Sequence, residues 1–116
     1  MNAVFSRIAI LIPSFNPNHN LFDLVLGLSS NPWNEIIVVN DGSSEESQIF
    51  FDNLKEINNV HLLTHSANKG KGVAIKTGIK YIKNKSSRLD GLITVDSDGQ
   101  HLIEDINKKS FSRLVE

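Results

Sequence analysis

Short apolar runs alternate with amphipathic segments along most of the chain. Four runs, at residues 8–12, 35–40, 60–64 and 91–96, have the length of β-strands, and the first two are uninterrupted, as in strands covered on both faces. The segments between and after them carry apolar side chains at helical spacing. These stripes are Leu21, Leu24, Val25 and Leu28; Phe50, Leu54 and Ile57; Ile75, Ile79 and Ile82; and, more weakly, Ile103, Ile106 and Leu114.

This strict alternation predicts an α/β fold, a Rossmann-like parallel sheet with helices on both faces. Taking the strands in chain order, we expect the spatial order 3-2-1-4. Ser43 and Glu46 have the spacing of a capping box, which predicts a helix N-terminus just after the second strand. Asn84, Ser86 and Ser87 predict the end of the third helix and a surface loop. Ligands of such sheets bind beyond the carboxyl ends of the strands, and polar clusters follow the strands here.

Composition narrows the class of protein. The chain has 116 residues, which predicts a single domain over residues 1–116, and its net charge of −1 gives no indication of a nucleic-acid partner. The absence of cysteine excludes disulfides and thiolate metal sites. No apolar run is long enough to span a bilayer, so the sequence predicts no membrane segment and a cytoplasmic location.

Two of the polar clusters follow the first two strands. Phe15, in Pro13-Ser-Phe-Asn-Pro17, could stack on a base or sugar, or could close the edge of the core. Asp41, in Asn40-Asp-Gly-Ser-Ser44, could accept hydrogen bonds from a nucleoside, or could cap the next helix together with Ser43. The residues alone leave both alternatives open.

Two further clusters suggest phosphate and metal chemistry. Asn68-Lys-Gly-Lys-Gly72 opens the third helix and suits a diphosphate, although it matches neither glycine-rich fingerprint and could be a plain basic surface. Asp96 and Asp98 repel each other unless a cation lies beside them, which favours Mg²⁺ or Mn²⁺ bound with phosphate oxygens. Gln100 could add an oxygen ligand, and His101 could be either a Mn²⁺ ligand or a surface residue.

Taken in order, these clusters resemble the family 2 glycosyltransferases, which have the GT-A fold. The most similar branch contains the dolichyl-phosphate mannose and glucose synthases. The resemblance spans residues 8–106 and is carried by Ile12-Pro-Ser-Phe-Asn16, Val38-Val-Asn-Asp-Gly-Ser-Ser44, Asn68-Lys-Gly-Lys-Gly-Val-Ala74 with Thr77-Gly78, and Asp96-Ser-Asp-Gly-Gln-His101 with Glu104-Asp-Ile106. It implies the N-terminal half of a nucleotide-diphospho-sugar transferase fold that takes a UDP- or GDP-linked sugar.

The resemblance also implies roles for individual residues. Nucleotide-sugar contacts are expected from the following residues: Pro13 and Phe15 beside the nucleotide, Val39 and Asp41 along the base and ribose, Lys71 as a nearby basic group, and Asp96 and Ser97 of the Asp-x-Asp element. Asp98 and Gln100 are the expected contacts of Mg²⁺ or Mn²⁺, with Asp96 close to the same ion. Pro17 stands where the family usually has an acidic residue, and Asn40 replaces the first Asp of the common D-D-G-S sequence.

Several expectations concern the protein as a whole. The family's acceptor pocket and catalytic base lie beyond the Asp-x-Asp element, so the sequence predicts a truncated domain and leaves the catalytic residues unassigned. An uncovered sheet edge predicts a homo-oligomer. The alternatives are a non-catalytic nucleotide-binding or dimerising module, and a phosphohydrolase that uses Asp96-Ser-Asp-Gly99.

Overall fold

A four-stranded parallel sheet forms the centre of the protein. The computed structural model describes residues 7–85 and 89–97. The strands are β1 (Ile8–Ser14), β2 (Asn34–Asp41), β3 (Val60–His65) and β4 (Gly91–Thr94), and they lie in the order β3-β2-β1-β4. All three pairings are parallel, so the predicted strands, order and direction are confirmed. The fourth strand ends at Thr94, two residues before the predicted end at 96.

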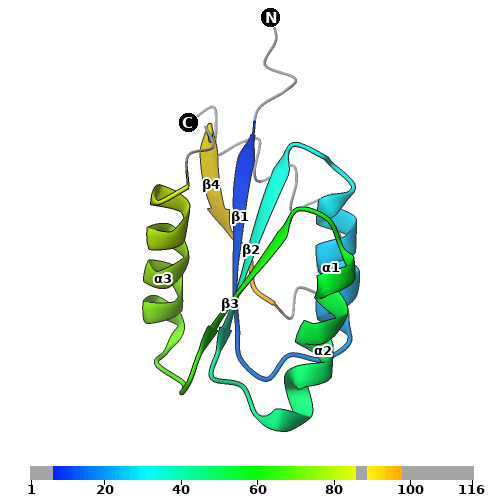
Figure 1. The fold of residues 1–116 in the computed structure, drawn as a ribbon, viewed down its shortest axis with the longest axis vertical. Helices are drawn as coiled ribbons and strands as arrows, with labels where there is room; N and C mark the ends of the chain where they lie inside the picture. Colours follow the sequence, from blue (N-terminus) through cyan, green and yellow to red (C-terminus); the bar gives the residue numbers. More distant parts are fainter. Residues whose placement is uncertain (1–6, 86–88, 98–116) are drawn as a thin grey trace, which may run out of the picture.

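Helices cover both faces of this sheet, as the alternation predicts. Figure 1 shows α3 (Lys71–Lys83) against one face, and α1 (Asn20–Ser29) with α2 (Gln48–Asp52) against the other. Short 3₁₀ turns flank α2 at Glu45–Ser47 (η2) and Asn53–Glu56 (η3). The helix expected around Ile103, Ile106 and Leu114 lies outside the described residues.

The larger part of the core lies between the sheet and α1. The predicted stripe of Leu21, Leu24, Val25 and Leu28 is buried against the β-strands. Every second residue of β1 and β2 points into this layer, because successive side chains in a strand point to opposite faces. Fully burying a side chain of this size contributes about 1.5–3 kcal/mol, so these contacts account for much of the stability of the fold.

The segment after β2 differs from the predicted single helix. It is divided into η2, α2 and η3, and Phe51 is the fully buried aromatic residue, while Phe50 is half-buried. The 3₁₀ turns contain three residues per turn, so side chains three apart share one face. Phe51 and Leu54 therefore enter the core together, and the predicted stripe was displaced by one residue at Phe50.

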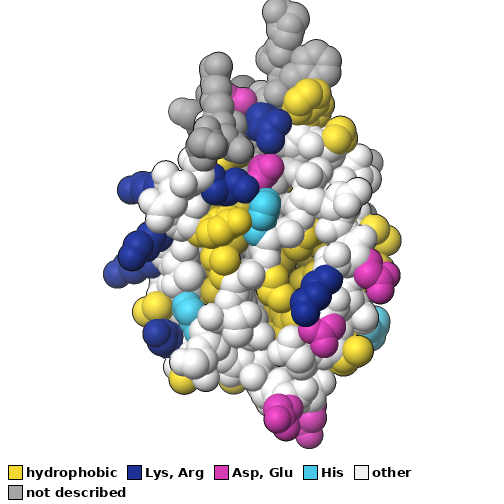
Figure 2. Space-filling view, viewed as in Figure 1, with side chains coloured by type: hydrophobic (Ala, Val, Ile, Leu, Met, Phe, Trp, Pro, Cys, Tyr) yellow, Lys and Arg dark blue, Asp and Glu magenta, His cyan; other side chains and the backbone are white. Residues whose placement is uncertain are grey.

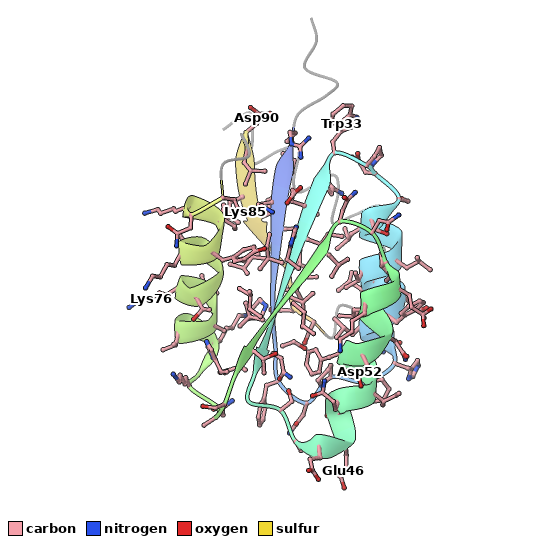
Figure 3. All side chains as sticks on the ribbon, in the orientation of Figure 1. Trp33, Glu46, Asp52, Lys76, Lys85 and Asp90 are labelled. Atoms are coloured by element: carbon pink, nitrogen blue, oxygen red, sulfur yellow. The ribbon has the colours of Figure 1, made fainter. Side chains whose placement is uncertain are left out.

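The predicted capping box at Ser43 and Glu46 is wrong. The first turn begins at Glu45, its N-cap residue is Ser44, and no side chain accepts a capping hydrogen bond there. The Ser43 hydroxyl oxygen instead accepts a hydrogen bond from the backbone N–H of Asn16, at 2.9 Å. Glu46 projects from the end of the molecule in Figure 3. Tertiary contact with the loop after β1 thus replaces the local cap.

The second face of the sheet packs against α3. Ala9, Leu11, Ile37, Val39 and Ala74 form its buried centre, and the predicted helical stripe of Ile75, Ile79 and Ile82 packs against them partly buried. Gly78 allows the close approach, because a Cβ there would lie 2.2 Å from Leu11 Cδ1. Helix α3 ends at its C-cap Asn84, as predicted, while Ser86 and Ser87 lie outside the described residues.

A charged cluster closes this layer at the amino ends of the strands. The Glu35 carboxylate is largely buried and lies 3.3 Å from Arg7 Nη2, 3.1 Å from His61 Nε2 and 3.4 Å from Lys85 Nζ. The other ring nitrogen of His61 lies 3.0 Å from the Tyr81 hydroxyl of α3. This cluster ties β2, β3 and α3 together at the end of the sheet that is remote from the polar loops.

Charge is unevenly distributed despite the small net value. The sequence from Ile57 to Leu89 contains no acidic residue, and it includes all the lysines of α3. Lys and Arg side chains gather beside α3 in Figure 2, and Lys76 projects away from the sheet in Figure 3. The α3 layer is therefore basic, and its N-terminal end brings this charge to the carboxyl ends of the strands.

Candidate functional site

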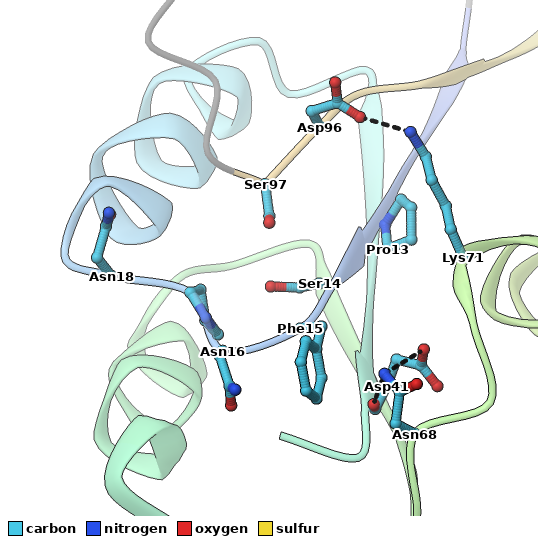
Figure 4. A pocket seen from close by; sticks show the side chains of 11 residues that line it. Pro13, Ser14, Phe15, Asn16, Asn18, Asp41, Asn68, Lys71, Asp96 and Ser97 are labelled. Atoms are coloured by element: carbon cyan, nitrogen blue, oxygen red, sulfur yellow. Dashed lines mark hydrogen bonds and ion pairs between the residues drawn. The ribbon is translucent and has the colours of Figure 1, made fainter. Parts of the chain in front are cut away.

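A cavity of about 550 Å³ opens at the carboxyl ends of β1 and β2, beside the segment that follows β4. Figure 4 shows side chains from four separate segments around it. The lining residues are Pro13, Ser14, Phe15, Asn16, Pro17, Asn18, Asp41, Asn68, Lys71, Asp96 and Ser97. Parallel strands end on one side of the sheet, which is why segments so distant in the sequence meet here. The crevice predicted at this position is present.

The loop after β1 is locked to the loop after β2. Asn16 has a positive φ of 49°, a conformation that asparagine tolerates better than most residues. Its side-chain oxygen accepts a hydrogen bond from the Ser44 N–H at 2.8 Å, while its own N–H donates to Ser43. This fixed loop presents the Phe15 ring, which is 51% exposed, at the cavity. Phe15 therefore does not close the core, and its face is free to stack on a planar ligand.

Ser14 carries a buried hydroxyl that has no hydrogen-bond partner among the described residues. The residue is 2% exposed and lines the cavity, and its Oγ makes no hydrogen bond in the described structure. A buried hydroxyl left unpaired costs about 1–3 kcal/mol. In Figure 4 the hydroxyls of Ser14 and Ser97 turn toward the same part of the cavity. A polar group of a ligand could supply the missing partner.

Asp41 is held by the loop that leads into α3. Its Oδ1 accepts from His65 Nδ1 at 2.8 Å and from the Lys69 N–H at 2.9 Å. Its Oδ2 accepts from the Gly70 N–H at 2.9 Å and from Asn68 Nδ2 at 3.2 Å. These four bonds fill the acceptor positions of a carboxylate. A ribose hydroxyl that contacted this carboxylate would have to displace one of the four.

The same contacts set the ionisation of Asp41. Burial alone raises the pKa of its carboxyl, since the side chain is only 4% exposed. The hydrogen bond from His65 and those from the Lys69 and Gly70 amides lower the pKa, and the net result lies below the ordinary value of 3.8. Asp41 is therefore an anion at neutral pH, and hydrogen bonds from the protein itself stabilise its charge.

His65 is a residue that the sequence analysis missed. Its side chain is 9% exposed, and its Nε2 lies 2.8 Å from Thr77 Oγ1 of α3. The available signal was the alternation of β3, because His61, Leu63 and His65 share the face that points to α3. A polar residue at such a position needs a partner, and Asp41 at the paired position of β2 provides it.

Lys71 and Asp96 meet across the cavity. Lys71 Nζ lies 2.8 Å from Asp96 Oδ1, and the two side chains are 62% and 67% exposed. Figure 4 shows this ion pair between the start of α3 and the segment after β4. An exposed pair of this kind contributes only about 0–1 kcal/mol, so a ligand can replace it at little cost.

Most of the predicted site residues come together here. Pro13, Phe15, Asp41, Lys71, Asp96 and Ser97 all line the cavity. Val39 does not: its side chain is fully buried between the sheet and α3, because it points to the face that α3 covers, which corrects the expectation that it lines the base. Asp98, Gln100 and His101 lie outside the described residues.

The α3 end of the cavity has the properties of an anion site. The first helical hydrogen bond runs from Ala74 N–H to the Gly70 carbonyl, so the amides of the preceding turn have no helical partner. No acidic residue lies in the first turn of α3. The Lys69 and Gly70 amides, however, are already bonded to Asp41, so the diphosphate contact expected from this loop is restricted to later amides and to the Lys71 side chain.

Two findings bear on metals and membranes. Within residues 7–85 and 89–97, no group of three or more His, Cys, Asp or Glu side chains is placed to hold a metal ion. Over the same part of the chain, no helix is long and apolar enough to cross a bilayer.

Comparison with known proteins identifies the family. Residues 9–108 match glycosyl transferase family 2, and the chain belongs to this family. It is 32% identical over 114 residues to the UDP-N-acetylglucosamine–dolichyl-phosphate N-acetylglucosaminyltransferase of Methanococcus voltae, covering 87% of this chain and 45% of that protein. It is 33% identical over 72 residues to a dolichyl-phosphate β-glucosyltransferase of Trichomonas vaginalis, covering 61% and 21% of the two chains. An uncharacterised protein of Methanocaldococcus jannaschii is 30% identical over 102 residues, covering 88% of this chain and 40% of that protein.

Solved structures confirm the GT-A fold. A mannosyltransferase from Pyrobaculum calidifontis, solved in complex with GDP-Man and Mn²⁺, superposes with a TM-score of 0.62 at 17% identity, over 79% of this chain and 27% of that one. TarS of S. aureus, in a structure of residues 1–349, superposes with a TM-score of 0.64 at 15% identity, over 90% and 31% of the two chains. The chain spans less than half the length of the curated relatives that it matches.

Proposed function

We propose that this chain forms the donor-binding part of a glycosyltransferase and binds a nucleoside-diphosphate sugar together with Mg²⁺ or Mn²⁺. The observation that carries the proposal is the cavity itself. It combines an exposed aromatic ring, a lysine at a helix N-terminus and a carboxylate, which come from three segments of the chain. Membership of glycosyl transferase family 2 supports this assignment.

Different lining residues suit the nucleoside and the diphosphate parts of the ligand. The Phe15 ring suits the base, because a planar aromatic face stacks on a planar heterocycle. Ser14 offers its unpaired hydroxyl to the nucleoside or the sugar. At the other end of the cavity, Lys71 and the first turn of α3 suit the diphosphate, since positive charge and free amides both attract phosphate oxygens.

The donor groups present fit a divalent cation that is bound together with the nucleotide. Asp96 and Ser97 place hard oxygen atoms in the cavity, and Asp98 follows directly in the sequence. Mg²⁺ in nucleotide sites is commonly held by one or two carboxylates plus phosphates, so a complete protein cage is not required. Lys71 Nζ lies 2.8 Å from Asp96 Oδ1, and this ion pair supports a carboxylate that is available to a positive charge.

The pairing of Lys71 with Asp96 suggests how the site receives its ligand. When bound, the divalent cation would stabilise the negative charge that develops on the leaving nucleoside diphosphate. Lys71 would then leave Asp96 and turn to the phosphate oxygens. The exchange costs little because the ion pair is largely exposed to water.

The transfer itself joins an acceptor oxygen to the anomeric carbon of the sugar and breaks the bond to the diphosphate. A hydroxyl acceptor would pass its proton to a general base, whereas an ionised phosphate acceptor attacks through an oxygen that carries no proton. None of the residues in the described cavity is assigned to that base. Two of the relatives are dolichyl-phosphate glycosyltransferases, which supports a lipid-linked phosphate as the acceptor class here.

Calorimetric titration of UDP and GDP, with Mn²⁺ and with EDTA, tests the donor site. We expect binding of one nucleotide that is strongly weakened without the metal. Asp98→Ala should weaken the metal-dependent binding by at least about tenfold, through loss of a direct ligand, whereas Asp52→Ala, at an exposed carboxylate on α2, should bind like the parent. Absence of binding for both nucleotides, or metal-independent binding, would overturn the proposal.

Lysine variants test the anion end of the cavity. Lys71→Met should weaken nucleotide binding roughly three- to thirtyfold, because a charge-assisted phosphate contact is lost. Lys76→Met is the matched control, since Lys76 lies on α3 but projects away from the sheet (Figure 3). Equal affinities for the two variants would exclude a specific role for Lys71.

A further inference from the structure

Two chains of polar side chains cross the face of the sheet that α3 covers. Each joins a carboxylate of β2, a histidine of β3 and a hydroxyl of α3. One consists of Asp41, His65 and Thr77, and the other of Glu35, His61 and Tyr81. The first reaches the cavity through Asp41, whereas none of the second three residues lines it. The two chains consist of the same types of residue in the same order, but only the first includes a residue that lines the cavity.

In the first chain, the hydrogen bond between His65 and Asp41 has a defined direction. A carboxylate only accepts, so His65 Nδ1 carries the proton that it donates to Asp41, at 2.8 Å. In the neutral ring, Nε2 is then an acceptor, and the Thr77 hydroxyl donates to it at 2.8 Å. His65 is thus held from both sides, with one nitrogen on β2 and the other on α3.

Asp41 in turn determines where the loop before α3 lies. It accepts the N–H groups of Lys69 and Gly70 and the side-chain amide of Asn68. Gly42 brings the two backbones together, since it has a φ of +69° and an added Cβ would lie 2.2 Å from the Asn68 nitrogen. Asn68 lines the cavity, and so does Lys71, three residues further along the sequence.

We propose that His65 and Thr77 are positioning residues of the donor site, which fix Asp41 so that its carboxylate holds the 68–71 loop and Lys71 at the cavity. This inference rests on the proposed donor function. It assigns the charge of Asp41 to the protein's own loop, so that the nucleotide meets the loop and the Lys71 side chain. Thr77 acts from outside the cavity lining, through two hydrogen bonds in sequence.

Paired variants separate positioning from general stability. Thr77→Val removes the hydroxyl at nearly constant volume, and Thr77→Ser keeps it. Tyr81→Phe removes the matching hydroxyl from the second chain, which does not reach the cavity. Amide hydrogen exchange at Lys69 and Gly70, followed by NMR, reports the loop without any ligand. Titration of the intact protein with UDP or GDP and Mn²⁺ reports the site.

We expect Thr77→Val to accelerate exchange at both amides roughly tenfold and to weaken nucleotide binding roughly three- to tenfold, as befits one lost hydrogen bond. Thr77→Ser should restore both values, and Tyr81→Phe should change neither. Parent-like exchange and affinity in Thr77→Val, or an equal loss of affinity in Tyr81→Phe, would overturn the inference.

The two proposals fail in different ways. A parent protein that binds neither nucleotide overturns the donor function and, with it, the placement of these residues in a donor site, whatever the amide exchange shows. A parent that binds nucleotide while Thr77→Val and Thr77→Ser bind with equal affinity leaves the donor function intact and overturns the positioning role alone.

Discussion

Replacement of Asp41 by asparagine is the most informative perturbation of this fold. The side chain keeps its shape, but one of its two oxygens becomes an amide nitrogen, which donates hydrogen bonds. Each oxygen of Asp41 accepts two hydrogen bonds, so Asp41→Asn leaves two donors facing another donor. The remaining oxygen is also neutral, which weakens the two bonds that persist.

The loss can be estimated from these contacts. A hydrogen bond to a charged group contributes about 1.5–3 kcal/mol, and a buried donor without a partner costs about 1–3 kcal/mol. Allowing for relaxation of the loop, we expect Asp41→Asn to lower the free energy of unfolding by about 3–5 kcal/mol, comparable with breaking a buried ion pair. This is a large part of the roughly 5–15 kcal/mol typical of a whole domain.

Urea denaturation at pH 7, followed by circular dichroism, measures this loss. Asp52→Asn is the control, because Asp52 also pairs with neighbouring side chains, at 3.0 and 3.4 Å, but is exposed on α2 (Figure 3). We expect little measurable change in the control. A loss below about 1 kcal/mol in Asp41→Asn would place Asp41 with ordinary surface carboxylates and would refute the account of the loop.

Three other predictions concern particular residues, and a fourth concerns the oligomeric state. The pKa of Asp41 is lowered below 3.8 in the folded protein, so its ionised carboxylate contributes fully to the free energy of unfolding above that pH. This contribution is lost as the pH falls through the folded pKa. Urea titrations from pH 5 to pH 2 should therefore show a steeper decline in the free energy of unfolding for the parent than for Asp41→Asn. Gly42→Ala should destabilise the protein by about 1–3 kcal/mol in the same assay, through its positive φ and the backbone of the facing loop, while Gly72→Ala, with open space around the added Cβ, should be neutral or stabilising. Ser14→Ala should leave stability unchanged or slightly higher, because it removes an unpaired buried hydroxyl, but should weaken nucleotide binding in calorimetry; unchanged affinity would show that the ligand does not use this group. Light scattering at increasing concentration should reveal a homo-oligomer, and a monomer throughout the range would contradict that expectation.

The sequence by itself determined the order and direction of the strands. Apolar runs alternate with helical stripes, and this periodicity follows from burial on both faces of a parallel sheet, which leaves few alternative topologies. It also located the cavity, because strands that run in the same direction bring their following loops to one edge. Phe15, Lys71 and Asp96 could therefore be assigned to one site although they come from three different loops.

The details of the loops were decided by tertiary contacts. Ser43 has the spacing of a local cap, yet its hydroxyl serves Asn16, and the broken helix after β2 buries Phe51 in place of Phe50. Propensities and capping rules describe neighbours in the sequence, whereas these contacts depend on which loop lies opposite.

The same reason explains the division of roles around Asp41. The sequence could show that a carboxylate follows the second strand, but it could not show that the carboxylate is already bonded to a loop 28 and 29 residues further along the chain. Nor could it pair His65 with Thr77, since that bond forms only when α3 folds back over β3. A polar side chain at the end of a strand is available to a ligand only if the fold has not provided its partner, and that depends on distances that no local pattern encodes.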